Sequence, residues 1–164
     1  MIWQCSDRAD IRALPLADRH YNRQKPGSPQ FVAPGSCFVL LAYDLGSLWV
    51  TSWPNCEYVK HAWAGAWINS LFRRETTPVL ASILIREAVA ATRWFYGEPP
   101  CLGMVTFVDA SKVRHKRDIG RCYRKAGFKH IGFTKGGLHA FQLEPCNMPA
   151  PEAPIGATLN LFTK

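Results

Sequence analysis

The amino-acid sequence predicts an α/β fold, in which strands form a central sheet and helices pack against it. Apolar, β-prone runs occur on both sides of one long segment with helical periodicity. Two pairs of these runs are separated only by a short turn, which is typical of β-hairpins. The 164 residues, 48% of them hydrophobic, are enough to bury one core.

The first half of the chain predicts a long loop followed by three strands. Residues 1–18 mix charges with short apolar pairs, which favours a strand or a short helix. Residues 19–35 contain repeated proline and glycine, which favours a loop. Residues 36–43 and 48–53 are apolar runs on either side of a turn and predict a hairpin. Residues 63–72 are largely apolar, as is typical of a buried strand.

The clearest helix is predicted to follow. Thr77 can cap its first turn, Pro78 suits its first position, and Gly97 ends it. Apolar residues recur along one face of this helix, at Leu80, Ile83, Leu84, Ala88 and Ala91.

The remainder of the chain predicts a strand, a short helix and a final hairpin. Residues 103–108 are a buried strand, and residues 119–128 contain a short basic helix. Residues 129–143 predict a hairpin with two glycines at its tip. We expect residues 1–144 to form a single domain and residues 145–164 to form a proline-rich tail on its surface.

Composition narrows the location of the protein. The longest apolar run, near residues 38–43, is far shorter than a membrane span, and the N-terminus lacks a hydrophobic secretory core. We therefore expect a cytoplasmic protein without a membrane partner. The six cysteines form no close pair, which predicts reduced, mostly buried thiols and no zinc site.

The charge balance favours a polyanionic partner. Lysine and arginine total 20 against 12 acidic residues, so the formal net charge is +8. Phosphate neutralisation dominates non-specific affinity for nucleic acids, so the charge favours DNA, RNA or the phosphates of a cofactor as the partner. A solvated basic surface is the alternative. The candidate DNA-binding residues are Arg23, Lys25, Lys112, Arg114, Lys116, Arg117, Arg121 and Arg124.

The element order and the closing segment resemble those of the GNAT acyltransferase superfamily. The closing segment is the basic helix and Gly-Phe of residues 119–128, followed by the final hairpin. The resemblance implies a mixed, mostly antiparallel, twisted sheet with a V-shaped splay, where an acyl-CoA donor and its acceptor meet. It also makes Tyr123 a candidate general acid. The loop before the long helix departs from the CoA-binding pattern, because Thr77 and Val79 stand at the glycine positions and Pro78 lacks an N–H.

A second resemblance is to the Mom family of phage proteins, which are related to GNAT enzymes. It rests on residues 19–24, 30–35, 71–75 and 82–88 and covers roughly residues 17–145. It implies that the partner is double-stranded DNA and that adenine in phage DNA is converted to N6-carbamoylmethyladenine, an anti-restriction modification made in the host cytoplasm. It also implies a small donor other than the usual acetyl-CoA and a suspected requirement for iron. Arg74 replaces the asparagine usual in that family.

Several residues are candidates for the chemistry of such a site. His20 and Tyr21 can bind a metal such as iron, because imidazole and phenolate are plausible iron ligands. Arg73 can orient the substrate, and Glu75 or Asp109 can take a proton from the adenine amine. A loop histidine, a surface ion pair and a turn cap are the respective alternatives. The expected catalytic set is Arg73, Glu75, Asp109, Tyr123 and Ser82.

Two other functions remain open from the sequence. One is conventional acyl-CoA-dependent N-acetylation of a small amine or a protein, and the other is DNA binding without catalysis. The sequence leaves both a monomer and a homodimer open.

Overall fold

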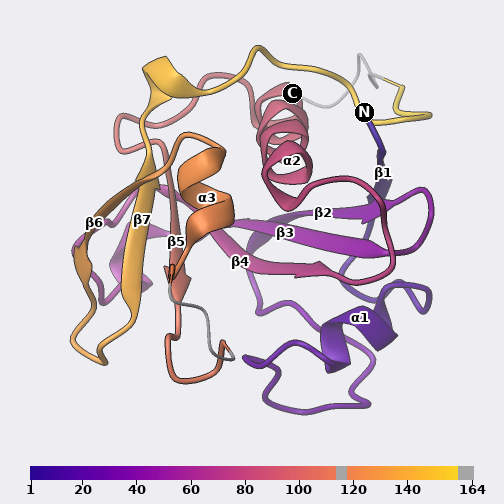
Figure 1. Cartoon of the computed structure of the whole chain (residues 1–164), viewed down its shortest axis with the longest axis horizontal. Coiled ribbons are helices and arrows are strands. Elements are labelled where there is room, and N and C mark those ends of the chain that lie inside the picture. The colour runs from indigo at the N-terminus through magenta and orange to yellow at the C-terminus, as the bar shows by residue number, and fades with distance from the viewer. Residues whose placement is uncertain (114–117, 159–164) are drawn as a thin grey trace.

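The computed structural model describes residues 1–113 and 118–158, and these form an α/β structure around an open sheet (Figure 1). The sheet has seven strands in the order β1-β2-β3-β4-β5-β7-β6. Neighbouring strands are antiparallel, except that β4 and β5 are parallel. The α/β prediction is therefore confirmed. The strands are β1 (Trp3–Ser6), β2 (Ser36–Ala42), β3 (Ser47–Trp53), β4 (Trp67–Arg74), β5 (Met104–Val108), β6 (Lys129–Phe133) and β7 (His139–Leu143).

Helices cover both faces of this sheet. The long helix α2 and the short helix α3 lie over one face, which we call the α2 face, and α1 lies over the other, the α1 face (Figure 1). On the α2 face, Leu84 and Val89 of α2 join a core with Trp49 and Trp67. On the α1 face, Leu16 packs with residues of the neighbouring strands. The helices are α1 (Leu14–Asp18), α2 (Ala81–Tyr96) and α3 (Arg121–Lys125), with short 3-10 turns at Cys56–Tyr58 and Pro145–Asn147.

The two parallel strands separate soon after they pair. Pairing between β4 and β5 covers three residue pairs and ends at Asn69 and Thr106. Beyond that point β4 stays paired with β3 as far as Arg74, and β5 stays paired with β7 as far as Val108. A gap in the hydrogen-bonded sheet therefore opens between their carboxyl-terminal ends.

A β-bulge marks the start of this separation. On β3, the adjacent residues Val50 and Thr51 pair with Leu71 and Asn69, so Ser70 of β4 is the extra residue. The Ser70 hydroxyl lies 3.2 Å from the hydroxyl of Ser52. Bulges bend a strand and re-aim its side chains, so this one sets which side chains of β4 point into the gap.

Two predicted boundaries were wrong. Strand β4 begins at Trp67 rather than at residue 63 and extends through Arg74. Helix α2 begins at Ala81, three residues later than Thr77 and Pro78 predicted. The guanidinium of Arg74 explains the delay, because it donates to the carbonyl oxygens of Thr77 (2.9 Å) and Val79 (2.8 Å) and holds them in a turn.

Most other elements lie where the sequence predicts them. The loop at residues 19–35, the β2–β3 and β6–β7 hairpins and the end of α2 at Gly97 are all confirmed. The described part of the tail crosses the end of the molecule, where Glu152 N–H donates to Ala90 O and Ile155 N–H donates to Trp3 O (Figure 1). No helix in the described ranges is long and apolar enough to cross a membrane.

The cysteines were predicted to be mostly buried, and this was wrong. Cys5, Cys56, Cys101 and Cys146 are exposed. Cys5 lies in β1, at the edge of the sheet, and the other three lie in connecting segments.

Candidate functional site

A cavity of about 820 Å³ occupies the gap between the separated ends of β4 and β5. Loop residues 20–22 reach it on the α1 face, and the starts of α2 and α3 reach it on the α2 face. Residues on both faces of the sheet therefore line it. Its lining includes His20, Tyr21, Asn22, Asn69, Phe72, Arg73, Arg74, Ser82, Thr106, Phe107, Lys112, Asp118, Arg121, Cys122, Tyr123 and Lys125.

The lining of this cavity is strongly cationic. Among the described residues, its charged side chains are five cations and the single carboxylate of Asp118. Asp118 also forms an ion pair with Arg124. Field lines concentrate in a cleft lined by charges of one sign, so the cavity favours an anionic ligand such as a phosphate ester. The five cations are Arg73, Arg74, Lys112, Arg121 and Lys125.

A buried hydrogen-bond network lies where the strands separate. Asn69 is 4% exposed and Thr106 is 2% exposed. The amide nitrogen of Asn69 donates to the carbonyl oxygens of Val50 (3.1 Å) and Leu71 (2.9 Å), which are the carbonyls beside the bulge. The Thr106 hydroxyl lies 3.1 Å from Asn69 Oδ1 and 3.2 Å from Asn69 O.

Tyr123 joins the same network from α3. Its hydroxyl donates to Asn69 Oδ1 at 2.8 Å. Its ring packs edge-on against Phe72 and Phe128 and parallel to Phe141. Burial raises the pKa of Tyr123 well above its usual value, although the nearby Thr106 hydroxyl acts in the opposite direction. The phenol is therefore neutral throughout the physiological range.

The start of α3 is held tightly against this ring cluster. Gly120 has φ +70°, and a Cβ placed there would lie 2.2 Å from the ring of Phe141. Only glycine fits this approach without displacing the ring. The contact thereby fixes the position of Tyr123 relative to Asn69.

Arg73 and Glu75 form an ion-pair cluster with Arg19. Nε and Nη2 of Arg19 donate to the two oxygens of the Glu75 carboxylate, each at 2.7 Å, and Arg73 Nε donates to Glu75 Oε1 at 2.9 Å. Hydrogen bonding from Arg19, and then from Arg73, lowers the pKa of Glu75. Arg73 lines the cavity, whereas the carboxylate of Glu75 is committed to the two arginines. Glu75 is placed to orient Arg73.

His20 and Tyr21 lie at the mouth of the cavity on the α1 face. Their rings stack with centroids 4.5 Å apart. His20 Nδ1 lies 2.5 Å from Asn22 Oδ1, and the amide nitrogen of Asn22 donates to the Ser70 carbonyl at the bulge (2.8 Å). Burial, reinforced by the charge of Arg73, lowers the pKa of His20, although the bond to Asn22 acts against the shift. The imidazole is therefore neutral at pH 7.

Asp109 and Ser82 occupy different positions relative to the cavity. Asp109 accepts hydrogen bonds from the Ser111 hydroxyl (2.6 Å) and the Ser111 N–H (2.9 Å), and these lower its pKa. It caps the turn after β5, and its N–H lies 3.5 Å from the Tyr21 hydroxyl. Ser82, in the first turn of α2, lines the cavity directly.

The predicted DNA-binding residues lie in different parts of the molecule. Arg121 and Lys112 line the cavity, and Arg124 lies on the same short helix with its side chain 41% exposed. Lys25 lies exposed in the long loop. Arg114, Lys116 and Arg117 lie outside the described residues.

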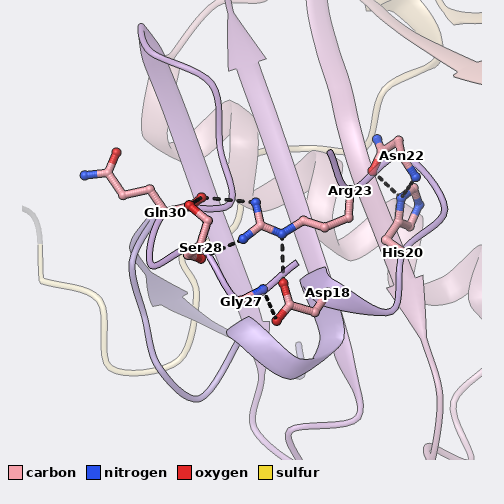
Figure 2. Close-up of polar contacts among 7 residues, drawn as sticks. All are labelled: Asp18, His20, Asn22, Arg23, Gly27, Ser28 and Gln30. Atoms are coloured by element: carbon pink, nitrogen blue, oxygen red, sulfur yellow. Dashed lines mark hydrogen bonds and ion pairs between the residues drawn. The ribbon is translucent and has the colours of Figure 1, made fainter. Parts of the chain in front are cut away.

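Arg23, the remaining predicted DNA-binding residue, instead stabilises the long loop. Figure 2 shows its guanidinium between Asp18, Ser28 and Gln30. It donates to Asp18 Oδ1 (2.8 Å) and to the carbonyl oxygens of Ser28 (2.6 Å) and Gln30 (3.1 Å), and its side chain is only 9% exposed. Arg23 therefore holds the loop in shape and has little surface to present to a phosphate.

Several backbone N–H groups in the loop before α2 already donate hydrogen bonds within the protein. The N–H of Glu75 donates to Gly46 O (2.8 Å), and that of Thr77 donates to Glu75 O (3.2 Å). The N–H of Val79 donates to Thr77 Oγ1 (3.3 Å), and Pro78 has none. These residues occupy the loop of the CoA-binding pattern, whereas the first N–H groups of helix α2 itself belong to Ala81 and the residues after it.

The residues around His20 do not make an iron site as they stand. His20 Nδ1 faces the Asn22 side chain, and Tyr21 faces the Asp109 backbone. Within residues 1–113 and 118–158, no group of three or more histidine, cysteine or acidic side chains is placed to hold a metal ion. The iron requirement stays a prediction.

Asn22, Asn69 and Thr106 were not identified from the sequence. Each is a common polar residue whose importance depends on a bulge and a strand separation that local sequence does not specify. The available signal for Asn69 was a lone amide within an otherwise apolar strand run. Comparison of the chain with protein-family models found no match, and searches of curated proteins and of solved structures found no similar protein.

Proposed function

We propose that this protein is a GNAT-type group transferase that modifies the exocyclic amine of adenine in DNA, as its resemblance to the Mom family implies. The observation that carries the proposal is the cationic cavity between β4 and β5, which side chains line from both faces of the sheet. A transferase must bring a donor and an acceptor together, and a cavity lined from both faces of the sheet offers separate groups to contact each of them. The cationic lining supports an acceptor that carries phosphates.

The proposed chemistry forms a bond between adenine N6 and the carbon of a small activated donor. The N6 lone pair is delocalised into the ring, so the reaction needs an extruded, oriented base and a group that takes one N6 proton. His20 supports this role, because its lowered pKa leaves a neutral imidazole beside the cavity. The donor's leaving group departs with its bonding electrons, while Arg73, held by Glu75, orients an anionic group.

Conventional acyl-CoA transfer is less well supported. The backbone N–H groups of residues 75, 77 and 79 already donate to other acceptors, and Pro78 has no N–H. Pyrophosphate binding there would require these bonds to break. Binding of CoA to the protein, measured by calorimetry, would favour this alternative over DNA modification.

Nucleoside mass spectrometry of DNA from cells that express the protein tests the proposal. We expect a new adenine adduct with the wild type and with Arg12→Ala, an exposed arginine paired with Asp10 outside the cavity. We expect none with Arg73→Ala or His20→Ala. Unmodified DNA from cells that contain folded wild-type protein would contradict DNA modification in that host.

A further inference from the structure

We infer that Asn69 fixes the Tyr123 hydroxyl as a hydrogen-bond acceptor toward the cavity, so that the cavity takes an N–H group as its ligand. The inference rests on the proposed function for the identity of that ligand as the adenine amine. It reverses the direction of proton donation expected of a general-acid tyrosine at this position.

The argument begins with the orientation of the Asn69 amide. An amide group has two N–H donors on its nitrogen and only acceptor sites on its oxygen. The nitrogen faces two carbonyl oxygens, those of Val50 and Leu71, and a flipped amide would set its oxygen against both of them. The orientation of Asn69 is therefore determined by its surroundings, and Oδ1 points at the hydroxyl of Tyr123.

The direction of the Tyr123 proton follows. Oδ1 can only accept, so the phenol must donate to it across the 2.8 Å contact. The raised pKa of Tyr123 keeps that proton in place at neutral pH. To protonate a leaving group in the cavity, the phenol would have to abandon a buried acceptor, which is costly.

The oxygen of Tyr123 then has only acceptor capacity left to offer a ligand. Tyr123, Asn69 and Thr106 line the cavity together. The hydroxyl of Thr106 has one hydrogen, which it can donate to either oxygen atom of Asn69. This part of the wall consequently favours a ligand that brings its own hydrogen. A primary amine such as adenine N6 does so, whereas a carbonyl in the same position sets oxygen against oxygen.

The direction of the hydrogen bond between Tyr123 and Asn69 can be measured without any ligand. In protein labelled at tyrosine and asparagine, we expect a slowly exchanging Tyr123 hydroxyl proton in the NMR spectrum, with a nuclear Overhauser contact to the Asn69 amide protons. Tyr123→Phe assigns the signal by removing it. A slowly exchanging hydroxyl proton without this contact, or a fast-exchanging one, would overturn the inference.

Binding of short single strands tests the ligand. Strands of deoxyadenosine, deoxynebularine and deoxyinosine carry an amine, a hydrogen and a carbonyl at the same ring position, with equal phosphate charge. We expect deoxyadenosine to bind about tenfold more tightly than deoxyinosine, and deoxynebularine to fall between them. Tyr123→Phe should bring the ratio close to one, while Tyr58→Phe, which removes the hydroxyl of an exposed tyrosine outside the cavity, should retain it.

The outcomes separate the inference from the proposed function. Equal binding of the three strands by the wild type, or an unchanged preference in Tyr123→Phe, would overturn the assignment of the amine to Tyr123 while DNA binding stands. Failure of all three strands to bind would overturn the nucleic-acid ligand itself. The hydroxyl spectrum would still decide whether Asn69 sets the polarity of Tyr123.

Discussion

Asn69 on β4 and Thr106 on β5 are the last paired residues of the two parallel strands, and the Thr106 hydroxyl lies 3.1 Å from Asn69 Oδ1. The strands separate immediately beyond this pair. A polar pair at this point satisfies groups that the ending ladder and the bulge leave without strand partners. The same two side chains then form part of the cavity wall, so the feature that ends the pairing also builds the site.

Asn69→Ala should lower the free energy of unfolding by about 3 kcal/mol, because two buried carbonyls and the Tyr123 hydroxyl lose a hydrogen-bond partner. Ser70→Ala removes a half-buried hydroxyl from the adjacent position and should cost less than about 1 kcal/mol. Urea denaturation followed by tryptophan fluorescence measures both changes. Equal losses in the two variants would show that the Asn69 network adds little to stability.

The arrangement of the long loop yields a matched pair of variants. Arg23→Ala should destabilise the protein by about 2 kcal/mol, since it removes the ion pair of Asp18 and the hydrogen bonds from Arg23 to two carbonyls (Figure 2). Lys25→Ala, two residues away and exposed, should change stability by less than about 0.5 kcal/mol. Thermal unfolding followed by circular dichroism distinguishes them. A stable Arg23→Ala protein would contradict the structural role of Arg23.

The sequence predicted the elements whose signals are local. Apolar runs around short turns located both hairpins, and Gly97, with φ +84°, located the end of α2. The start of α2 was misplaced because a capping threonine and a proline are equally compatible with a turn. Arg74, which lies in the preceding strand, decides between them through contacts that local propensity does not contain.

The candidate site was predictable only in part, for the same reason. Arg73, Ser82, Tyr123 and His20 were identified, and all four line the cavity. The cluster of Glu75 with Arg19 was not, because it joins residues 56 positions apart through the folded loop. Asn69 was missed because its role depends on hydrogen bonds to carbonyls on two strands, which the local sequence does not reveal.

The Glu75 cluster predicts a pH-dependent contribution to stability. The pKa of Glu75 is lowered in the folded protein, so its ion pairs stabilise the fold above the unfolded pKa, near 4.5, and this contribution is lost as the pH falls through the folded value. At pH 7, Glu75→Gln should lose about 1 kcal/mol, a modest amount because the Arg19 side chain is 51% exposed.

Below the folded pKa of Glu75, the wild type carries a neutral carboxyl there and should match Glu75→Gln in stability. Glu98→Gln, which changes an exposed glutamate at the end of α2, serves as the control for the loss of one negative charge. Denaturation midpoints between pH 3 and pH 7 measure the difference. A gap between wild type and Glu75→Gln that stays constant over this range would contradict the ion-pair account.

The cationic cavity lining makes a prediction about salt. If Lys112, Arg121 and Lys125 each neutralise one phosphate, each alanine substitution should weaken binding of duplex DNA and lower the slope of log affinity against log salt by about 0.9. Arg12→Ala removes the same charge from an exposed side chain outside the cavity and should leave the slope almost unchanged. Fluorescence anisotropy at several salt concentrations measures the slopes.

If Arg12→Ala lowers the slope as much as the cavity variants do, DNA binding depends only on the net charge of the protein. A selective loss at the cavity would instead show that the phosphates pass along the gap between β4 and β5, where an extruded base could reach Tyr123.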